Sequence, residues 1–140
     1  MSAADNKKLM QEIYARVADL DTSLFVEHLA EDATWQVTGQ YSWSHTFRGR
    51  DAILKSLHGH VRARIEGRPR TLAYNFIAEG DLVVIEAKGD NLTVDGARYD
   101  NDYCFVFRLA NGQIKEIKEY CDSTLTEAAL GPFPPERVLA

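Results

Sequence analysis

The residues best suited to chemistry lie in one stretch near the end of the chain. Residues 101–123 read NDYCFVFRLANGQIKEIKEYCDS. Apolar residues alternate with polar ones on either side of Asn111 and Gly112. This pattern predicts two strands joined by a turn, because Asn and Gly tolerate positive φ angles. Glu119 lies in the second strand, where an inward-pointing carboxylate would be a candidate general acid or base.

The alternation in this hairpin divides its side chains between two faces. One face belongs in water because it carries the charged residues Asp102, Arg108, Lys118 and Asp122. Glu119 falls on the other face, among aromatic and apolar neighbours. Whether that face points into the protein decides whether the chain looks like an enzyme.

Composition narrows the class of protein. The chain has 140 residues, 45% hydrophobic and 26% charged, which is typical of one soluble domain. A formal net charge of −5 argues against nucleic-acid binding and against docking on anionic membranes. There is no apolar run of transmembrane length and no signal-peptide core, so a cytoplasmic location is expected. A solvated helix face is our interpretation of the basic residues Arg62, Arg64, Arg68 and Arg70.

No residue pattern typical of a metal or cofactor site occurs. Cys104 and Cys121 belong to no CxxC or other metal-spaced cluster. His58 and His60 are two positions apart, so on a helix their rings would point to different sides. We therefore expect neither a metal nor a cofactor.

Helices are expected in the first half of the chain. Ser2 and Asp5 have the spacing of a capping box, and apolar residues spaced by three and four predict a helix to about Ala18. A short helix is expected over residues 24–32, and another from Asp51.

Strands dominate the second half. Period-two alternation, with turn signals between the runs, predicts strands over residues 33–38, 71–78, 82–94, 97–109 and 113–122. Helices followed by an antiparallel meander indicate an α+β fold. We expect a curved antiparallel sheet wrapped around the N-terminal helices, forming a cone with a pocket at its open end. This single domain is expected over residues 1–131, before an extended, Pro-rich C-terminal tail over residues 132–140.

Four segments resemble the nuclear transport factor 2-like superfamily, and within it the SnoaL-like and ketosteroid isomerase-like members. They are the first helix with Tyr14, the segments HLAEDATWQV (28–37) and HTFRGRDAI (45–53), and the hairpin of residues 101–123. The resemblance implies that the last strand turns alternate side chains into the pocket, so Glu119 points inward. The resemblance is weak evidence for a particular function, because this fold hosts many activities.

The isomerases of this family use an Asp base, with a Tyr and a protonated Asp as oxyanion donors. By resemblance, the donor position corresponds to Tyr14 and the protonated Asp lies near Tyr103. The base position falls on Val37, so the usual base is missing.

The remaining inward residues suggest another site. Burial would raise the pKa of Glu119, which could then transfer protons near neutral pH, and His45 is the other candidate base. Tyr14 and Tyr103 could donate to a developing oxyanion. Each of the four also has a purely structural interpretation. The pocket is expected to be lined by Trp35, Val37, Trp43, Phe47, Asn101, Phe105, Ile117 and Cys121.

Three functions follow from this site. The leading hypothesis is a small enzyme doing cofactor-free acid/base chemistry on an apolar carbonyl or hydroxyl compound. The second is a ligand-binding or dimerisation domain without catalysis, which the missing Asp favours. Water addition of the epoxide-hydrolase type is third. The resemblance also implies a homodimer through the outer sheet face, where apolar residues such as Val84 and Val106 seek a partner.

Overall fold

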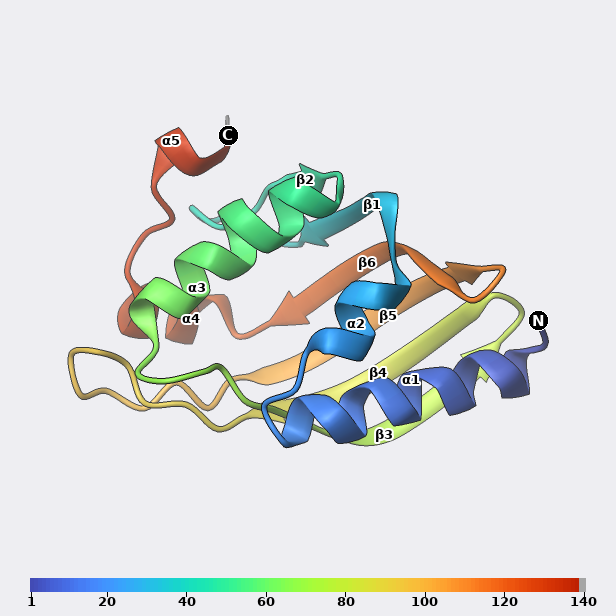
Figure 1. Cartoon of the computed structure of the whole chain (residues 1–140). Helices are drawn as coiled ribbons and strands as arrows, with labels where there is room; N and C mark the ends of the chain where they lie inside the picture. Colours follow the sequence, from blue (N-terminus) through green and yellow to red (C-terminus); the bar gives the residue numbers. More distant parts are fainter. Residues whose placement is uncertain (139–140) are drawn as a thin grey trace.

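The computed structural model describes residues 1–138 and contains a six-stranded sheet with helices on one face (Figure 1). In chain order the elements are α1 (Ala3–Ala18), α2 (Ser23–His28), β1 (Leu29–Val37), β2 (Thr46–Arg48), η1 (Ala52–Leu57), α3 (His58–Arg64), β3 (Thr71–Glu79), β4 (Leu82–Gly89), β5 (Asp102–Ala110), β6 (Gln113–Cys121), α4 (Ser123–Leu130) and α5 (Pro135–Val138). The predicted α+β class, with a curved sheet and N-terminal helices, is confirmed. No helix in the described part is long and apolar enough to span a membrane.

The sheet has the strand order β2-β1-β6-β5-β4-β3. Strands β3 to β6 form the predicted antiparallel meander, but β1 pairs with β6 in parallel. The expectation of an entirely antiparallel sheet was wrong at this pair. β1 precedes the meander in the chain, so no hairpin turn joins β1 to β6. Without such a turn the two strands can run in the same direction. The parallel register sets Val37 opposite Glu119.

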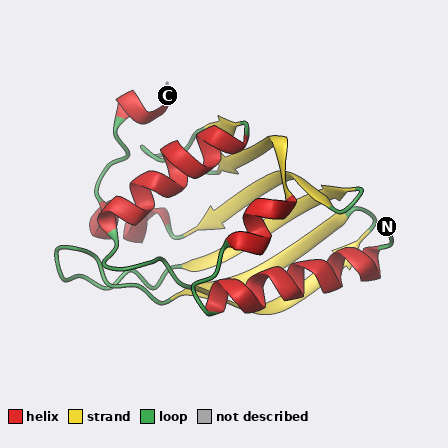
Figure 2. Cartoon of the chain, in the orientation of Figure 1, coloured by secondary structure: helices red, strands yellow, loops and turns green. Residues whose placement is uncertain are grey.

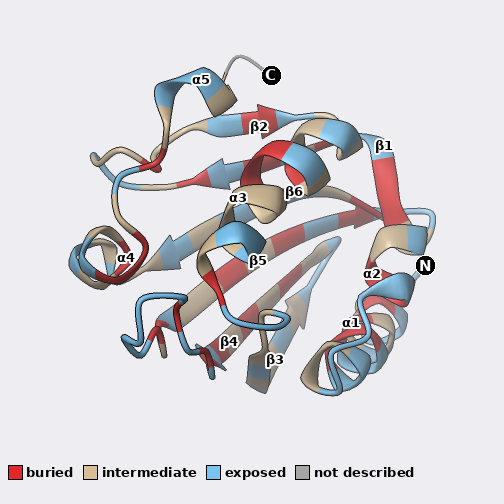
Figure 3. Ribbon diagram, turned by 60° about the vertical axis from the view of Figure 1, so that its left-hand side comes forward, coloured by how far each residue is buried: buried red, intermediate tan, exposed pale blue. Residues whose placement is uncertain are grey.

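The helices cover the concave face of the sheet (Figure 2). The capping box of α1 forms as predicted, since the Ser2 hydroxyl accepts from the Asp5 backbone N–H at 3.1 Å and the Asp5 carboxylate accepts from the Ser2 N–H at 3.1 Å. Met10 and Ile13 are fully buried where α1 packs against β3 and β4. Buried residues also mark the central strands β4 and β5, including the fully buried Phe107 (Figure 3).

Two predicted strands are shorter than their alternation suggested. β4 ends at Gly89 and β5 begins at Asp102, so the connection between them is a long loop. The side chain of Asn91 holds this loop, accepting from the Arg70 backbone N–H at 2.7 Å and donating to its carbonyl at 3.2 Å. These bonds replace part of the strand ladder. The second helix is also shorter than predicted. It ends at His28, and β1 begins at Leu29 instead of residue 33.

The C-terminal segment is not the extended tail that its prolines suggested. Residues 135–138 form α5, and Phe133 is 3% exposed. The Phe133 ring packs at centroid distances of 4.8 Å from Trp43 and 5.4 Å from Phe47. An aromatic residue with such partners outweighs the local preference of proline for extended backbone. The end of the predicted tail, residues 139–140, lies outside the described residues.

Candidate active site

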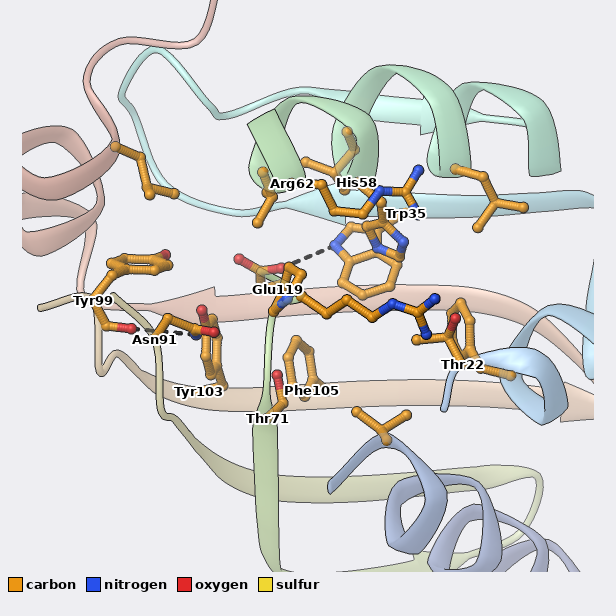
Figure 4. Close-up of a pocket in the computed structure, with 18 of the residues that line it drawn as sticks. Thr22, Trp35, His58, Arg62, Thr71, Asn91, Tyr99, Tyr103, Phe105 and Glu119 are labelled. Atoms are coloured by element: carbon orange, nitrogen blue, oxygen red, sulfur yellow. Dashed lines mark hydrogen bonds between the residues drawn. The ribbon is translucent and has the colours of Figure 1, made fainter. Parts of the chain in front are cut away.

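A cavity of about 650 Å³ lies between the helices and the concave face of the sheet. Its wall is largely aromatic and aliphatic, and Figure 4 shows its polar groups. The lining residues that matter most here are Tyr14, Trp35, Tyr41, Trp43, His58, Arg62, Arg68, Asn91, Tyr99, Tyr103, Phe105, Glu119 and Thr126. Such a volume with few polar groups is typical of small-molecule sites.

Glu119 is the one carboxylate that lines this cavity among the described residues. It lies on β6, on the face that the alternation assigned to it, opposite Phe105 of β5. Its Oε1 accepts a hydrogen bond from Trp35 Nε1 at 3.1 Å. Burial raises the pKa of Glu119 to about 7, although the Trp35 hydrogen bond lowers it. The carboxyl group can therefore gain or lose a proton near neutral pH.

Tyr14 and Tyr103 line the same cavity and bracket Phe105. The Tyr103 ring stacks on Phe105 at 5.1 Å, and the Tyr14 ring lies 6.2 Å from it. Burial, followed by the charge of Glu119, raises the pKa of Tyr14 well above its usual range. Burial, with Tyr99 and Glu119 nearby, does the same to the pKa of Tyr103. Both phenols therefore keep their protons and can act as hydrogen-bond donors.

His58 lines the cavity, although the sequence analysis considered it only as a poor metal ligand. Its ring packs edge-on against Trp35 at 4.8 Å. Burial, and to a lesser degree Arg62, lowers the pKa of His58 to about 4, so the imidazole is neutral at pH 7. The signal was available in the sequence. An amphipathic stripe with helical spacing contains Leu54, Leu57, His58, Val61 and Arg62, all of which line the cavity.

His45, the other candidate base, does not line the cavity. Its backbone belongs to the edge of the sheet, where its carbonyl accepts from the Val37 N–H at 2.9 Å. Its ring lies 6.4 Å from Phe47 and 6.2 Å from Phe133. The His45 ring thus lies near the C-terminal segment and outside the cavity lining that contains Glu119.

Trp35, Trp43 and Phe105 line the cavity as expected, but five other predicted lining residues do not. The apolar ones, Val37, Phe47 and Ile117, are buried in the hydrophobic core outside the cavity lining. The half-buried Cys121 has its thiol 3.5 Å from the Tyr41 hydroxyl and 3.6 Å from that of Thr126. Those outside the lining are Val37, Phe47, Asn101, Ile117 and Cys121.

Asn101 has a structural task instead. Its amide nitrogen donates to the Tyr99 hydroxyl at 3.1 Å and to the Thr126 hydroxyl at 3.0 Å. Its amide oxygen accepts from the Asp122 backbone N–H at 3.0 Å. Asn101 is fully buried and joins the start of β5 to the start of α4. It thereby positions Tyr99 and Thr126, two cavity residues that the sequence analysis did not identify.

The basic run is only partly the solvated helix face that was expected. Arg64 pairs with Asp95 at 2.5 Å, and Arg70 lies 3.5 Å from Asp90. Arg62 and Arg68 are exposed but line the cavity. Among residues 1–138 no group of three or more potential metal-ligating side chains could hold a metal ion.

Comparisons with solved structures show the same fold in other proteins. An NTF2-like protein of unknown function from Burkholderia pseudomallei is 22% identical, with a TM-score of 0.77 over 93% of this chain and 98% of that one. A candidate SnoaL-like polyketide cyclase from Jannaschia sp. CCS1 is 16% identical, with a TM-score of 0.73 over 95% of each chain. A candidate isomerase from Bacillus subtilis is 17% identical, with a TM-score of 0.74 over 95% of this chain and 99% of that one.

No curated protein matched this chain. The model of the SnoaL-like domain matches residues 10–117, which include the second half of α1, the β1 strand with Trp35, and the first part of β6. The matched region thus holds most of the cavity wall, including Tyr14, His58 and Tyr103. Members of this fold include polyketide cyclases and isomerases. The chain belongs to the SnoaL-like domain family.

Proposed function

We propose that the protein is a small enzyme that performs cofactor-free acid/base chemistry on an apolar carbonyl or hydroxyl compound. One observation carries the proposal: the carboxyl group of Glu119, whose pKa burial raises to about 7, lines an aromatic cavity. A proton-transfer group works best when its pKa lies near the working pH. A carboxyl group so placed can serve as base in one step and as acid in the next.

In this reaction the Glu119 carboxylate takes a proton from the carbon next to a carbonyl group. The electron pair of the broken C–H bond moves to the carbonyl oxygen, giving an enolate. The protonated phenols of Tyr14 and Tyr103 donate hydrogen bonds to that oxygen. Protonated Glu119 then returns the proton, either to another carbon, which isomerises the substrate, or to a leaving hydroxyl, which departs as water.

His58 is the second proton-transfer candidate, in the role that the sequence analysis gave to His45. A neutral imidazole can accept a proton, or donate one through its N–H. Both groups contact Trp35, since the His58 ring packs edge-on against the indole at 4.8 Å and the indole nitrogen donates to Glu119 at 3.1 Å. A substrate beside Trp35 would lie near both proton-transfer groups.

Ligand binding without catalysis is the alternative function. The Trp35–Glu119 hydrogen bond favours it, because a carboxyl group with a fixed partner can also act as a structural link between strands. By resemblance, Val37 stands where the isomerases of this family carry their Asp base, and this also favours binding without catalysis. Water addition of the epoxide-hydrolase type has less support, since Glu119 is the only carboxylate lining the cavity in the described part of the chain.

Exchange of solvent deuterium into a panel of apolar cyclic ketones, followed by NMR, tests the proposal without knowledge of the substrate. Glu119→Gln should slow exchange by about 100-fold or more, the usual contribution of a general base. Tyr14→Phe should slow it by a smaller factor. The control is Tyr120→Phe, which changes an exposed tyrosine of the same strand, β6. Wild-type exchange by Glu119→Gln, or tight binding of these ketones without any exchange, would favour the binding function.

A further inference from the structure

Two arginines line the cavity whose interior is otherwise nearly uncharged. Arg62 belongs to α3, and Arg68 lies in the connection between α3 and β3. Both side chains are exposed, so they lie where the cavity meets solvent. Figure 4 shows Arg62 beside His58 on the helical side of the cavity. Its positive charge also contributes to the lowered pKa of His58, which places the guanidinium close to the cavity lining.

Neither arginine forms an ion pair within 4.0 Å in residues 1–138, although Arg68 is near enough to Asp21 to contribute to the lowered pKa of that carboxyl group. Arg64 and Arg70, from the same basic run, both form ion pairs, as do Arg98 and Arg108 on the surface. Arg68 instead donates to the Leu20 carbonyl at 3.2 Å, and this bond tethers its guanidinium beside the residues that precede α2.

The charge balance of the cavity is therefore positive. Arginine is always protonated in proteins, whereas Glu119 is half neutralised at a pH near its pKa of about 7. A guanidinium presents planar N–H donors that match carboxylate, sulfate and phosphate groups. Arginine stems also cover apolar surface while their heads stay in water, which is the competing, purely structural interpretation.

We propose that the cavity binds a flat, ring-containing ligand that carries an anionic group, held at the mouth by Arg62 and Arg68. The aromatic wall formed by residues such as Tyr14, Trp35 and Phe105 receives the ring system. The arginines fix which end enters first, so the uncharged end reaches Glu119. This assignment of ligand class rests on the proposed function only in taking the cavity as the place where substrate binds.

Two fluorescent probes separate charge from ring binding. 1-Anilinonaphthalene-8-sulfonate has a sulfonate, whereas N-phenyl-1-naphthylamine has the same rings without it. Binding inside the cavity can be followed by quenching of protein fluorescence, because the only tryptophans of the chain, Trp35 and Trp43, both line it. The variant Arg62→Gln/Arg68→Gln removes the proposed anion site. The matched control, Arg48→Gln/Arg50→Gln, removes the same charge from residues outside the cavity lining.

The Arg62→Gln/Arg68→Gln variant should bind the sulfonate probe at least tenfold more weakly, while its affinity for the uncharged probe changes less than twofold. The control variant should bind both probes like the wild type. Far-UV circular dichroism checks that the variants are folded. If the variant fails to fold, raising the salt concentration should weaken binding of the sulfonate probe alone to the wild type. Equal loss of both probes, no loss, or no quenching of the wild type by the sulfonate probe would overturn the inference.

A Glu119→Gln variant keeps this test apart from the proposed catalysis. It should bind the sulfonate probe at least as tightly as the wild type, since it removes only a negative charge. An enzyme role that fails in the exchange assay would leave these probe affinities unchanged. Conversely, loss of the anion preference would leave the role of Glu119 in deuterium exchange standing.

Discussion

The indole nitrogen of Trp35 donates a hydrogen bond to Oε1 of Glu119 at 3.1 Å, across the pair of parallel strands β1 and β6. This contact joins residues 84 positions apart. It fixes one oxygen of the carboxyl group in the wall of an apolar cavity. The bond favours the ionised form while burial opposes it, and the pKa of about 7 reflects the larger effect of burial.

Glu119→Gln should change how stability depends on pH. The folded pKa of about 7 exceeds the ordinary value of 4.5, so the folded state binds more protons at Glu119 between these values, and the contribution of Glu119 to stability falls as pH rises through that window. Gln does not titrate. The free energy of unfolding of the variant should therefore increase relative to that of the wild type between pH 5 and pH 8, by up to roughly 3 kcal/mol. Urea unfolding at both pH values measures this gain, and a constant difference would show that Glu119 is not strained.

His58→Asn should reveal the opposite dependence. The folded pKa of about 4 lies below the ordinary 6.5, so the unfolded state binds more protons at His58 between these values, and the contribution of His58 to stability falls as pH decreases through them. Glu119 and His58 thus act in opposite directions between about pH 4.5 and 6.5. Removing His58 alone should make stability fall steadily as pH rises, and removing Glu119 alone should make it rise.

The double variant Glu119→Gln/His58→Asn serves as the control for both changes. Its stability should depend less on pH between pH 5 and 6.5 than that of either single variant, because both opposing groups are gone and the half-buried His60, whose pKa burial lowers, remains. Urea unfolding at several pH values across this window provides the measurement. A steep profile in the double variant would mean that another group dominates the pH dependence.

Trp35→Phe should change the pKa of Glu119. Removing the indole donor takes away a bond that favours the ionised carboxylate, so the pKa of Glu119 should rise above about 7. With Glu119 as base, deuterium exchange into ketones should then need a higher pH. Trp43→Phe is the control, since Trp43 lines the cavity but donates to the Gly131 carbonyl at 2.9 Å. Identical pH profiles for both variants would contradict the role of Glu119 as base.

The outer face of the sheet should mediate a homodimer. Ile77, Val84 and Val106 lie side by side on neighbouring strands, and Ile77 is 56% exposed. Burying such an apolar row in a symmetric contact is favourable. Ile77→Glu should convert the dimer to a monomer in analytical ultracentrifugation, whereas Val94→Glu, at an exposed loop position, should not. A wild-type monomer at high protein concentration would rule the contact out.

Local patterns predicted the parts of the fold whose partners are close in sequence. The capping box at Ser2 and the hairpin around Gly112 are set by neighbouring residues. Strand alternation placed Glu119 on the same face as its aromatic neighbours, but only the family resemblance implied that this face points inward. The remainder depends on distant partners. The parallel β1–β6 pair brings Trp35 to Glu119, and nothing in either segment indicates the other. His45 was chosen for its chemistry, but the loop that carries it bends toward Phe133.

Phe133 influences the shape of the cavity from outside its lining. It does not line the cavity, yet it packs against Trp43, which does, and its backbone N–H donates to the Ser42 hydroxyl at 2.8 Å. The size of the side chain at position 133 therefore limits how far the indole of Trp43 can tilt outward. A substitution at position 133 would therefore change the space available to the ligand without altering any residue of the cavity lining.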